Sequence, residues 1–309
     1  LTRIASSHIR VGTFEYVNNF CSKEDLQIFI KYVIDRHYPE ISGADNPALE
    51  LLKVVMLRQI ALIVNWLRVG FIHGVMNTDN MSIAGETMDY GPCAFMNRYN
   101  PRTVFSSIDI NGRYAFGNQS TIAHWNLAVF ASTLLPFISV NKEKAIQLAE
   151  ETLNKFPEEF SMNWYQMMYK KLGILKPIQE DKVLVDMLLQ LMDNHQADYT
   201  NTFAALTLNK VSDDNLFSSS KFNEWRKQWE NRTNHTDNRI NALKLMQTQN
   251  PLVISRNHLV ESALENAIKG NKSQFNELLN LISKPYNYKS NHNNFQTMPA
   301  GFDDCYKTF

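Results

Sequence analysis

The sequence has 309 residues, of which 44% are hydrophobic and 20% are charged. This composition is typical of a globular protein large enough for one large core or two joined ones, and it excludes disorder over most of the chain. The 31 Lys and Arg side chains balance 31 Asp and Glu side chains, so no overall basic field exists to attract nucleic acid or an anionic membrane. We therefore expect neither as a partner, and any anion must be bound locally.

Three cysteines at wide spacing, Cys21, Cys93 and Cys305, argue against a disulfide framework and against a Cys-rich zinc site. The longest apolar stretches are interrupted by Lys, Arg or Asn, which predicts no membrane span, and no signal-peptide pattern opens the chain. The expected location is the cytoplasm for a bacterial source and the mitochondrion for a eukaryotic one. Because Leu1 leads at once into patterned sequence, we expect the numbering to begin inside a longer parent chain.

The first helical signals have clear boundaries. Ser22 and Asp25 form a capping box ahead of an apolar face with i, i+3, i+4, i+7 spacing, and this helix should end before Pro39. A second helix should have Pro47 in its first turn and Gly70 as its C-cap. At 1.5 Å per residue it is about 35 Å long, as expected of a central core helix.

The residue pattern changes between residues 71 and 117, where frequent Gly, Asn, Asp and Pro predict loops and short strands. A helical pattern resumes at about Ile122, ends near Pro136 and restarts with Asn141 as an N-cap. The remainder is predicted to be mainly helical, over residues 158–172, 181–193, 197–209, 221–230, 236–248, 256–269 and 273–282.

These patterns predict a mainly α fold of the α+β class with two domains. The first, residues 1–140, is the mixed half that bears the loops. The second, residues 141–309, is a helical C-terminal extension whose tail from residue 285 has no periodicity.

One loop carries groups suited to phosphate chemistry. Residues 73–80 read His-Gly-Val-Met-Asn-Thr-Asp-Asn, and Asp89-Tyr-Gly begins nine residues after Asn80. This order of parts after a long helix is typical of kinase-like proteins, in which an Asn and the Asp of the second motif hold magnesium. Hard divalent cations prefer oxygen ligands, and a reacting triphosphate needs its charge neutralised. The alternative is a capped turn without chemistry, because Asn, Asp and Gly also form ordinary turns.

The usual catalytic base is missing from this loop. Phosphotransferases with a similar loop carry the base at its third position, which is Val75 here. Asp79 is the nearby carboxylate, so either it handles the proton or the chain is inactive. His73 and Cys93 are interpreted as structural residues.

Several stretches of the sequence resemble the selenoprotein O family. Residues 70–83 with Asp89-Tyr-Gly-Pro are similar to the family signature, and the resemblance extends over nearly the whole chain. The other matching stretches are residues 1–3, 7–15, 112–119, 198–203 and 250–261.

This resemblance implies the C-terminal lobe of a protein kinase-like fold and transfer of AMP from ATP to Ser, Thr or Tyr hydroxyls of proteins. It also implies that Asn80 and Asp89 bind Mg²⁺ or Mn²⁺ and that Asp79 is the base. Arg3 and Arg10 match family arginines that hold the phosphates, and an Arg fork suits phosphate geometry. The seven-residue interval between them predicts two helical turns and a shared helix face.

The resemblance also sets limits on the expected activity. The family's Gly-rich loop, its nucleotide-binding Lys and the Glu partner of that Lys belong to an N-terminal lobe that these 309 residues lack, so we expect this fragment to be inactive by itself. Family members carry a redox-active residue near the C-terminus, and Cys305 lies in that region without a matched position. Two other functions stay open: an ordinary phosphotransferase, and a non-catalytic ATP-binding pseudokinase scaffold.

Overall fold

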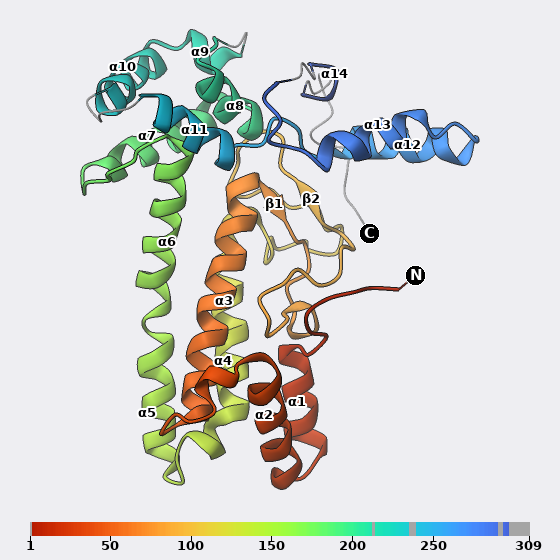
Figure 1. Cartoon of the computed structure of the whole chain (residues 1–309), viewed down its shortest axis with the longest axis vertical. Coiled ribbons are helices and arrows are strands. Elements are labelled where there is room, and N and C mark those ends of the chain that lie inside the picture. The colour runs from red at the N-terminus through yellow and green to blue at the C-terminus, as the bar shows by residue number, and fades with distance from the viewer. Residues whose placement is uncertain (1, 212–213, 235–238, 290–292, 297–309) are drawn as a thin grey trace. The chain divides into compact units, whose positions relative to one another are not determined.

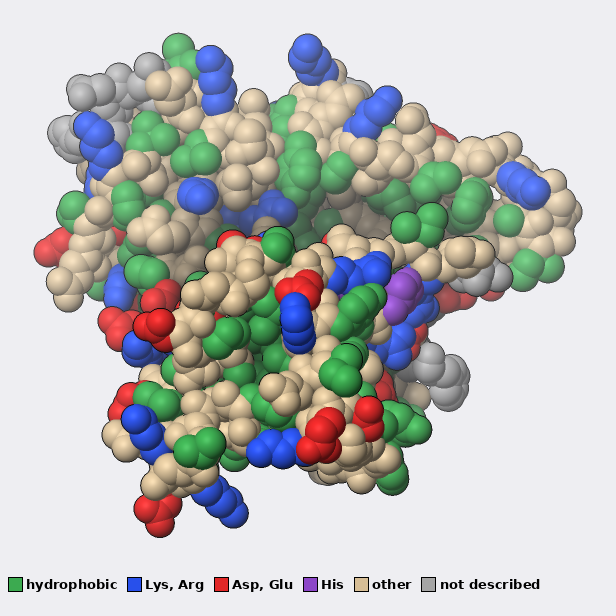
Figure 2. All heavy atoms as spheres, turned by 60° about the horizontal axis from the view of Figure 1, so that its bottom comes forward, with side chains coloured by type: hydrophobic (Ala, Val, Ile, Leu, Met, Phe, Trp, Pro, Cys, Tyr) green, Lys and Arg blue, Asp and Glu red, His purple; other side chains and the backbone are tan. Residues whose placement is uncertain are grey.

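The structure is a computed structural model that describes residues 2–211, 214–234, 239–289 and 293–296. The described chain is mainly helical and contains one two-stranded antiparallel sheet (Figure 1). The predicted mainly α character is therefore confirmed. Charged side chains of both signs are interspersed on the surface shown in Figure 2, in keeping with the balanced composition.

The chain forms two compact units, and each contains segments that are distant in sequence. The first consists of Leu1–Asn65, Val75–Gly91 and Asn118–Asn163, and the second of Trp66–Gly74, Pro92–Gly117 and Trp164–Phe309. Each unit combines three separate segments of the chain, so the division does not test a single boundary in the sequence. The predicted domain boundary near residue 140 stays a prediction.

The first unit begins with helices α1 (Val11–Phe20) and α2 (Lys23–His37), followed by a 3-10 turn at Pro39–Ile41. The predicted capping box at the start of α2 is confirmed. The Asp25 backbone N–H donates to Ser22 Oγ, and the Ser22 backbone N–H donates to Asp25 Oδ2, both at 3.1 Å. Two N–H groups that the helix leaves without partners are thereby satisfied.

Most of α3 (Pro47–Val69), with α4 (Gln119–Ile138) and α5 (Lys142–Leu153), belongs to this unit, while the last turn of α3, from Trp66, belongs to the second. The core forms where Phe14 of α1 packs against Phe29 of α2 and Phe130 of α4, each with ring centroids 4.8 Å apart. Phe14 is fully buried. Such aromatic pairs add stabilisation beyond the area they bury.

Helix α4 ends near Pro136, as predicted, with Ile138 as its last residue. Proline removes one N–H from the last turn, but α4 ends two residues later, so little of the helix lies beyond the missing hydrogen bond. Asn141 is the N-cap of α5 as predicted, since its side chain accepts from the Lys144 backbone N–H at 2.9 Å.

One helical stretch differs from the expectation that no segment could span a membrane. Residues Phe116–Ile138 are long and apolar enough by length and composition, and 50% of the tested window is buried inside the protein. Within it, Asn126 is buried and its Nδ2 donates to the Met76 carbonyl at 2.9 Å. The core helix of a globular protein has the same properties, so this single stretch supports no membrane assignment.

The second unit contains the sheet, in which β1 (Phe71–Ile72) pairs antiparallel with β2 (Ala94–Phe95). Gly70 stands between α3 and β1 with φ +76°, as a helix C-cap requires. The other described helices agree with the predicted helical ranges to within a few residues, apart from two short ones, α9 and α14. They are α6 (Phe156–Lys171), α7 (Asp181–His195), α8 (Tyr199–Leu208), α9 (Asn215–Ser218), α10 (Ser220–Asn234), α11 (Arg239–Gln249), α12 (Asn257–Ile268), α13 (Ser273–Ile282) and α14 (Asn293–Gln296).

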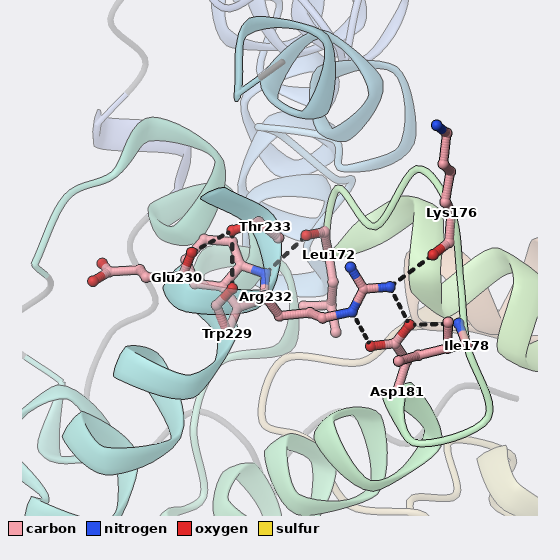
Figure 3. A network of polar contacts seen from close by, with 8 residues as sticks. All are labelled: Leu172, Lys176, Ile178, Asp181, Trp229, Glu230, Arg232 and Thr233. Carbon is pink, nitrogen blue, oxygen red and sulfur yellow. Dashed lines mark hydrogen bonds and ion pairs between the residues drawn. The ribbon is translucent and has the colours of Figure 1, made fainter. Parts of the chain in front are cut away.

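An ion pair between a partly exposed arginine and a buried aspartate connects α10 with the start of α7 (Figure 3). Arg232 Nε and Nη2 donate to Asp181 Oδ1 and Oδ2 at 2.7 and 2.9 Å, and Asp181 is 1% exposed. The same guanidinium donates to the Lys176 carbonyl, and the Ile178 backbone N–H donates to Asp181. Each charge is therefore hydrogen-bonded, which the burial of an ion pair requires.

A buried lysine is the last residue of α6 and contacts the C-terminal turn of α3. Lys171 is 1% exposed, and its Nζ donates to the Arg68 carbonyl at 2.7 Å. The same Nζ lies 4.0 Å from the ring centroid of Phe203 and 5.0 Å from that of Tyr199. Burial, with a smaller contribution from the charge of Arg68, lowers the pKa of the Lys171 ammonium well below its ordinary value.

We predict that Arg232→Met lowers the free energy of unfolding by about 3 kcal/mol, because the Asp181 carboxylate stays buried without its partner. Arg232→Lys should cost less, since it keeps the charge and loses the two parallel hydrogen bonds. Lys227→Met, at an exposed position of α10, is the matched control and should change stability by less than about 0.5 kcal/mol. Urea unfolding measures all three, and equal effects of Arg232→Met and Lys227→Met would contradict the prediction.

Lys171 should make stability depend on pH. Because its pKa is lowered in the folded state, the unfolded chain binds the proton more tightly, so stability rises with pH and falls as pH drops toward the folded-state pKa. From about pH 7 to about pH 9.5, the unfolding free energy of the wild type should rise relative to that of Lys171→Met. Lys170→Met changes an exposed neighbour and should follow the wild-type curve. Parallel curves for wild type and Lys171→Met would rule out this linkage.

Candidate functional site

The five predicted site residues all lie in the first compact unit. Backbone pairing between residues 9–11 and 81–83 brings the two stretches that carry them together. The Val11 N–H donates to the Met81 carbonyl at 2.9 Å, and the Ile83 N–H donates to the Ile9 carbonyl at 3.1 Å. Arg10 and Ser82 form the antiparallel bridge between these two hydrogen bonds. The segment that carries the arginines is thus attached to the loop that carries Asp79 and Asn80.

The helical spacing predicted for Arg3 and Arg10 is wrong. Residues 2–9 have no regular secondary structure, and Arg10 has the extended backbone angles φ −123° and ψ 165°. Helix α1 begins only at Val11, because backbone groups of residues 9 and 11 pair with the loop. The two arginines therefore lie along a non-helical segment that bends at Ser6, and no helix face unites them.

Arg10 occupies the N-cap position of α1, and its backbone N–H donates to Thr13 Oγ1 at 3.1 Å. Its side chain has a buried Nε atom without a hydrogen-bond partner in the part of the chain that the structure describes. A buried donor without a partner carries a free-energy cost that an acceptor would remove. The oxygens of a phosphate group are suitable acceptors for a guanidinium.

Asp79 lies in a 3-10 turn, Thr78–Asn80, and its side chain is exposed to solvent. Its carboxylate rests against the first turn of α1 at Gly12. A Cβ atom placed on Gly12 would lie 2.3 Å from Asp79 Oδ1, so a side chain at residue 12 would displace the carboxylate. The positive end of the helix dipole also favours a negative group there. Gly12 and α1 together hold a solvent-accessible carboxylate in a defined place.

Asn80 is 9% exposed, and its orientation is fixed within the loop. Its Nδ2 donates to the Val75 carbonyl at 2.9 Å, which leaves the amide oxygen as the end that can bind a cation. The loop is held from α4 by Asn126, whose Nδ2 donates to the Met76 carbonyl. Our sequence reasoning missed Asn126, although a lone Asn between apolar residues of a helix is a signal that a buried partner exists.

Asp89 has the left-handed backbone angle φ +62°, which is uncommon for residues other than glycine. Its Oδ1 lies 3.5 Å from Arg3 Nη2, and these side chains are 46% and 42% exposed. An ion pair with this exposure contributes little to stability. The pairing nevertheless shows that Arg3 can reach the neighbourhood of Asp89. Left-handed conformations of such residues cost free energy and often occur at functional sites.

The donor set at Asn80 and Asp89 fits a hard divalent cation. It consists of one amide oxygen and one carboxylate, and Mg²⁺ is usually bound by one or two carboxylates together with substrate phosphates and water. Among the described residues, no group of three or more His, Cys, Asp or Glu side chains could hold a metal ion. A site built only from protein side chains, as structural zinc requires, is therefore not found in that part of the chain.

The residues interpreted as structural lie in the second unit. His73 is fully buried and its ring centroid lies 5.2 Å from that of Trp66, which supports a packing role. Cys93 is partly buried. Cys305, for which a redox role was left open, lies outside the described residues.

Comparisons with known proteins identify the family to which the chain is similar. A family model described as "Protein adenylyltransferase SelO" matches residues 1–283. Proteins called "Protein nucleotidyltransferase YdiU" from Brevibacillus brevis and Clostridium botulinum are 50% and 48% identical over 100% of this chain, and the match covers 63% of each relative. A protein of the same name from Bacillus mycoides is 47% identical, with 64% of its length covered.

The chain thus spans a little less than two thirds of the length of these relatives. The family match includes the loop with Asp79 and Asn80, the Asp89 motif and the segment of the two arginines. Since this match extends over most of the 309 residues, the chain belongs to the protein adenylyltransferase SelO family.

Proposed function

We propose that the whole protein to which this chain belongs is a protein adenylyltransferase that transfers AMP from ATP to Ser, Thr or Tyr hydroxyls of other proteins. The observation that carries this proposal is the presence of Arg3, Arg10, Asp79, Asn80 and Asp89 in one compact unit of a chain from this family. The activity is assigned to the whole protein because the chain spans only 63% of its relatives.

In this proposal, Asn80 and Asp89 hold Mg²⁺ or Mn²⁺ through their side-chain oxygens. The cation, when bound, neutralises charge on the phosphates of ATP. Arg3 and Arg10 bind phosphate oxygens, and this role is supported by the Arg10 Nε atom, which has no hydrogen-bond partner among the described residues. Positioning and charge stabilisation of this kind supply most of the catalysis of phosphoryl transfer.

Asp79 acts as the general base in this scheme. The acceptor hydroxyl oxygen bonds to the α-phosphorus of ATP, the bond to the β-phosphate breaks, and pyrophosphate leaves with the electron pair. The hydroxyl proton moves to the Asp79 carboxylate. The exposure of Asp79 supports this role, because a protein acceptor has to reach the base from solvent.

The finer fold assignment is part of the same proposal. We infer that residues 1–140 are the C-terminal lobe of a kinase-like fold and that residues 141–309 are its helical extension. The order of a long helix α3, a loop with Asp79 and Asn80, and then Asp89-Tyr-Gly supports it. A cytoplasmic location is proposed because the relatives compared above are bacterial proteins.

We predict that the whole protein transfers label from ATP to protein when the α-phosphate is labelled and not when the γ-phosphate is labelled. Asp89→Asn should lower transfer by roughly 100-fold, since it removes the carboxylate while Asn tolerates the left-handed backbone. Asp45→Asn, at an exposed position of the same unit, is the control. Transfer of γ label would make the protein a phosphotransferase, and ATP binding without any transfer would make it a scaffold.

Gly12→Ala should separate catalysis from nucleotide binding. The added Cβ atom pushes the Asp79 carboxylate away, and a displacement of about 1 Å costs roughly 100-fold in rate. The affinity for ATP should hardly change, because Asp79 acts on the acceptor. Ala favours a helix by up to about 1 kcal/mol over Gly, so unfolding would not explain the loss.

The matched control for this experiment is Gly43→Ala, because a Cβ atom there meets nothing within 4 Å. Transfer rates and equilibrium ATP binding are measured for both variants. A Gly12→Ala protein with the wild-type transfer rate would show that the position of Asp79 does not matter, and it would remove Asp79 from the proposed mechanism.

A further inference from the structure

The segment that carries both proposed phosphate-binding arginines has no regular secondary structure to hold it. It is attached to residues 81–89 at three points. Arg10 forms the backbone bridge with Ser82, Ser6 donates hydrogen bonds to Glu86, and Arg3 forms an ion pair with Asp89. As the segment runs back from residue 10 to residue 3, its partners run forward from residue 82 to residue 89. The segment and its partners thus run in opposite directions, with the contact at Glu86 between the two arginines.

The middle contact joins two donors of one residue to one carboxylate. The Ser6 backbone N–H donates to Glu86 Oε2 at 2.9 Å, and the Ser6 hydroxyl donates to Glu86 Oε1. These two hydrogen bonds are the main reason that the pKa of Glu86 is lowered, and the charges of Arg58 and His37 contribute in the same direction. Hydrogen bonds to an ionised acceptor are stronger than those between neutral groups.

Glu86 itself is held in place by the turn that precedes it. Met81 and Thr87 form an antiparallel bridge, and Gly85 turns the chain with φ +69°. The turn lies directly on α3, because a Cβ atom on Gly85 would lie 2.8 Å from Arg58 Cβ and 2.9 Å from the Arg58 carbonyl oxygen. The turn next to Glu86 therefore packs against the long core helix α3, whereas the segment that Glu86 binds is irregular.

We propose that Glu86 is a positioning residue for nucleotide binding, which fixes Ser6 and so holds the segment with Arg3 and Arg10 against residues 82–89. This inference rests on the proposed function. Arg10 is fixed by its pairing with Ser82, but Arg3 lies seven residues away along an irregular segment, so its position relative to Arg10 depends on the attachment at Ser6. Attachment before the nucleotide arrives lowers the ordering cost of binding.

The test uses the whole protein and its Glu86→Ala variant, with Glu150→Ala as the matched control at an exposed position of α5 in the same unit. We expect Glu86→Ala to weaken the binding of ATP with Mg²⁺ about tenfold, which corresponds to ~1.4 kcal/mol. Amide hydrogen exchange of residues 3–9 should become faster, while the midpoint of thermal unfolding stays near that of the wild type. Glu150→Ala should match the wild type in all three measurements.

Ser6→Ala provides the second variant, since it removes the hydroxyl donor at an exposed position that does not contribute to the core. If Glu86 acts through Ser6, this substitution weakens ATP binding in the wild type and has no further effect in the Glu86→Ala protein. Independent effects of the two substitutions, or wild-type ATP binding and exchange in Glu86→Ala, would overturn the inference. Failure of the wild type to bind ATP would instead refute the proposed function.

Discussion

The candidate site depends on the short antiparallel pairing between residues 9–11 and 81–83. Two backbone hydrogen bonds there join parts of the chain that are about seventy residues apart, and they fix Arg10 against the loop that carries Asp79 and Asn80. The same pairing sets the start of α1 at Val11, which places Gly12 beneath the Asp79 carboxylate. A pairing of three residues on each side is weak by itself. The aromatic cluster around Phe14 supports it, because Phe14 follows directly in α1 and packs against α2 and α4.

The features that could be predicted from the sequence are those fixed by local chemistry. The capping box of Ser22 and Asp25, the Asn141 cap and the Gly70 turn each depend on neighbouring residues, and each is observed. The segment of Arg3 and Arg10 was misjudged because a seven-residue spacing fits a helix, whereas the distant pairing imposes an irregular course. Asn126 was missed for a similar reason, since its partner at Met76 is fifty residues away. The sequence suggested the five candidate residues, whose roles stay predictions, but it did not reveal the distant contacts that hold them in place.

The second compact unit handles its buried charges in two different ways. Arg232 donates two parallel hydrogen bonds to Asp181, so the two charges compensate each other. Neighbouring backbone groups form further hydrogen bonds with both side chains. Lys171 has no carboxylate among its recorded contacts and relies on a helix-end carbonyl and two aromatic rings. Burial accordingly lowers its pKa. The composition gave no indication of either arrangement, because Lys and Asp side chains are usually exposed, whereas Lys171 and Asp181 are each 1% exposed.

The backbone at Asp89 restricts that position before any chemistry is considered. A φ of +62° is readily adopted by Gly and is tolerated by Asn and Asp, and it disfavours branched and longer side chains. Of the three tolerated residues, only Asp carries a negative charge. Glu, the nearest chemical substitute, is disfavoured by conformation even though it could also bind a cation. Substitution at this position is therefore restricted first by the main-chain conformation, and the proposed binding of a cation would restrict it again by requiring a carboxylate.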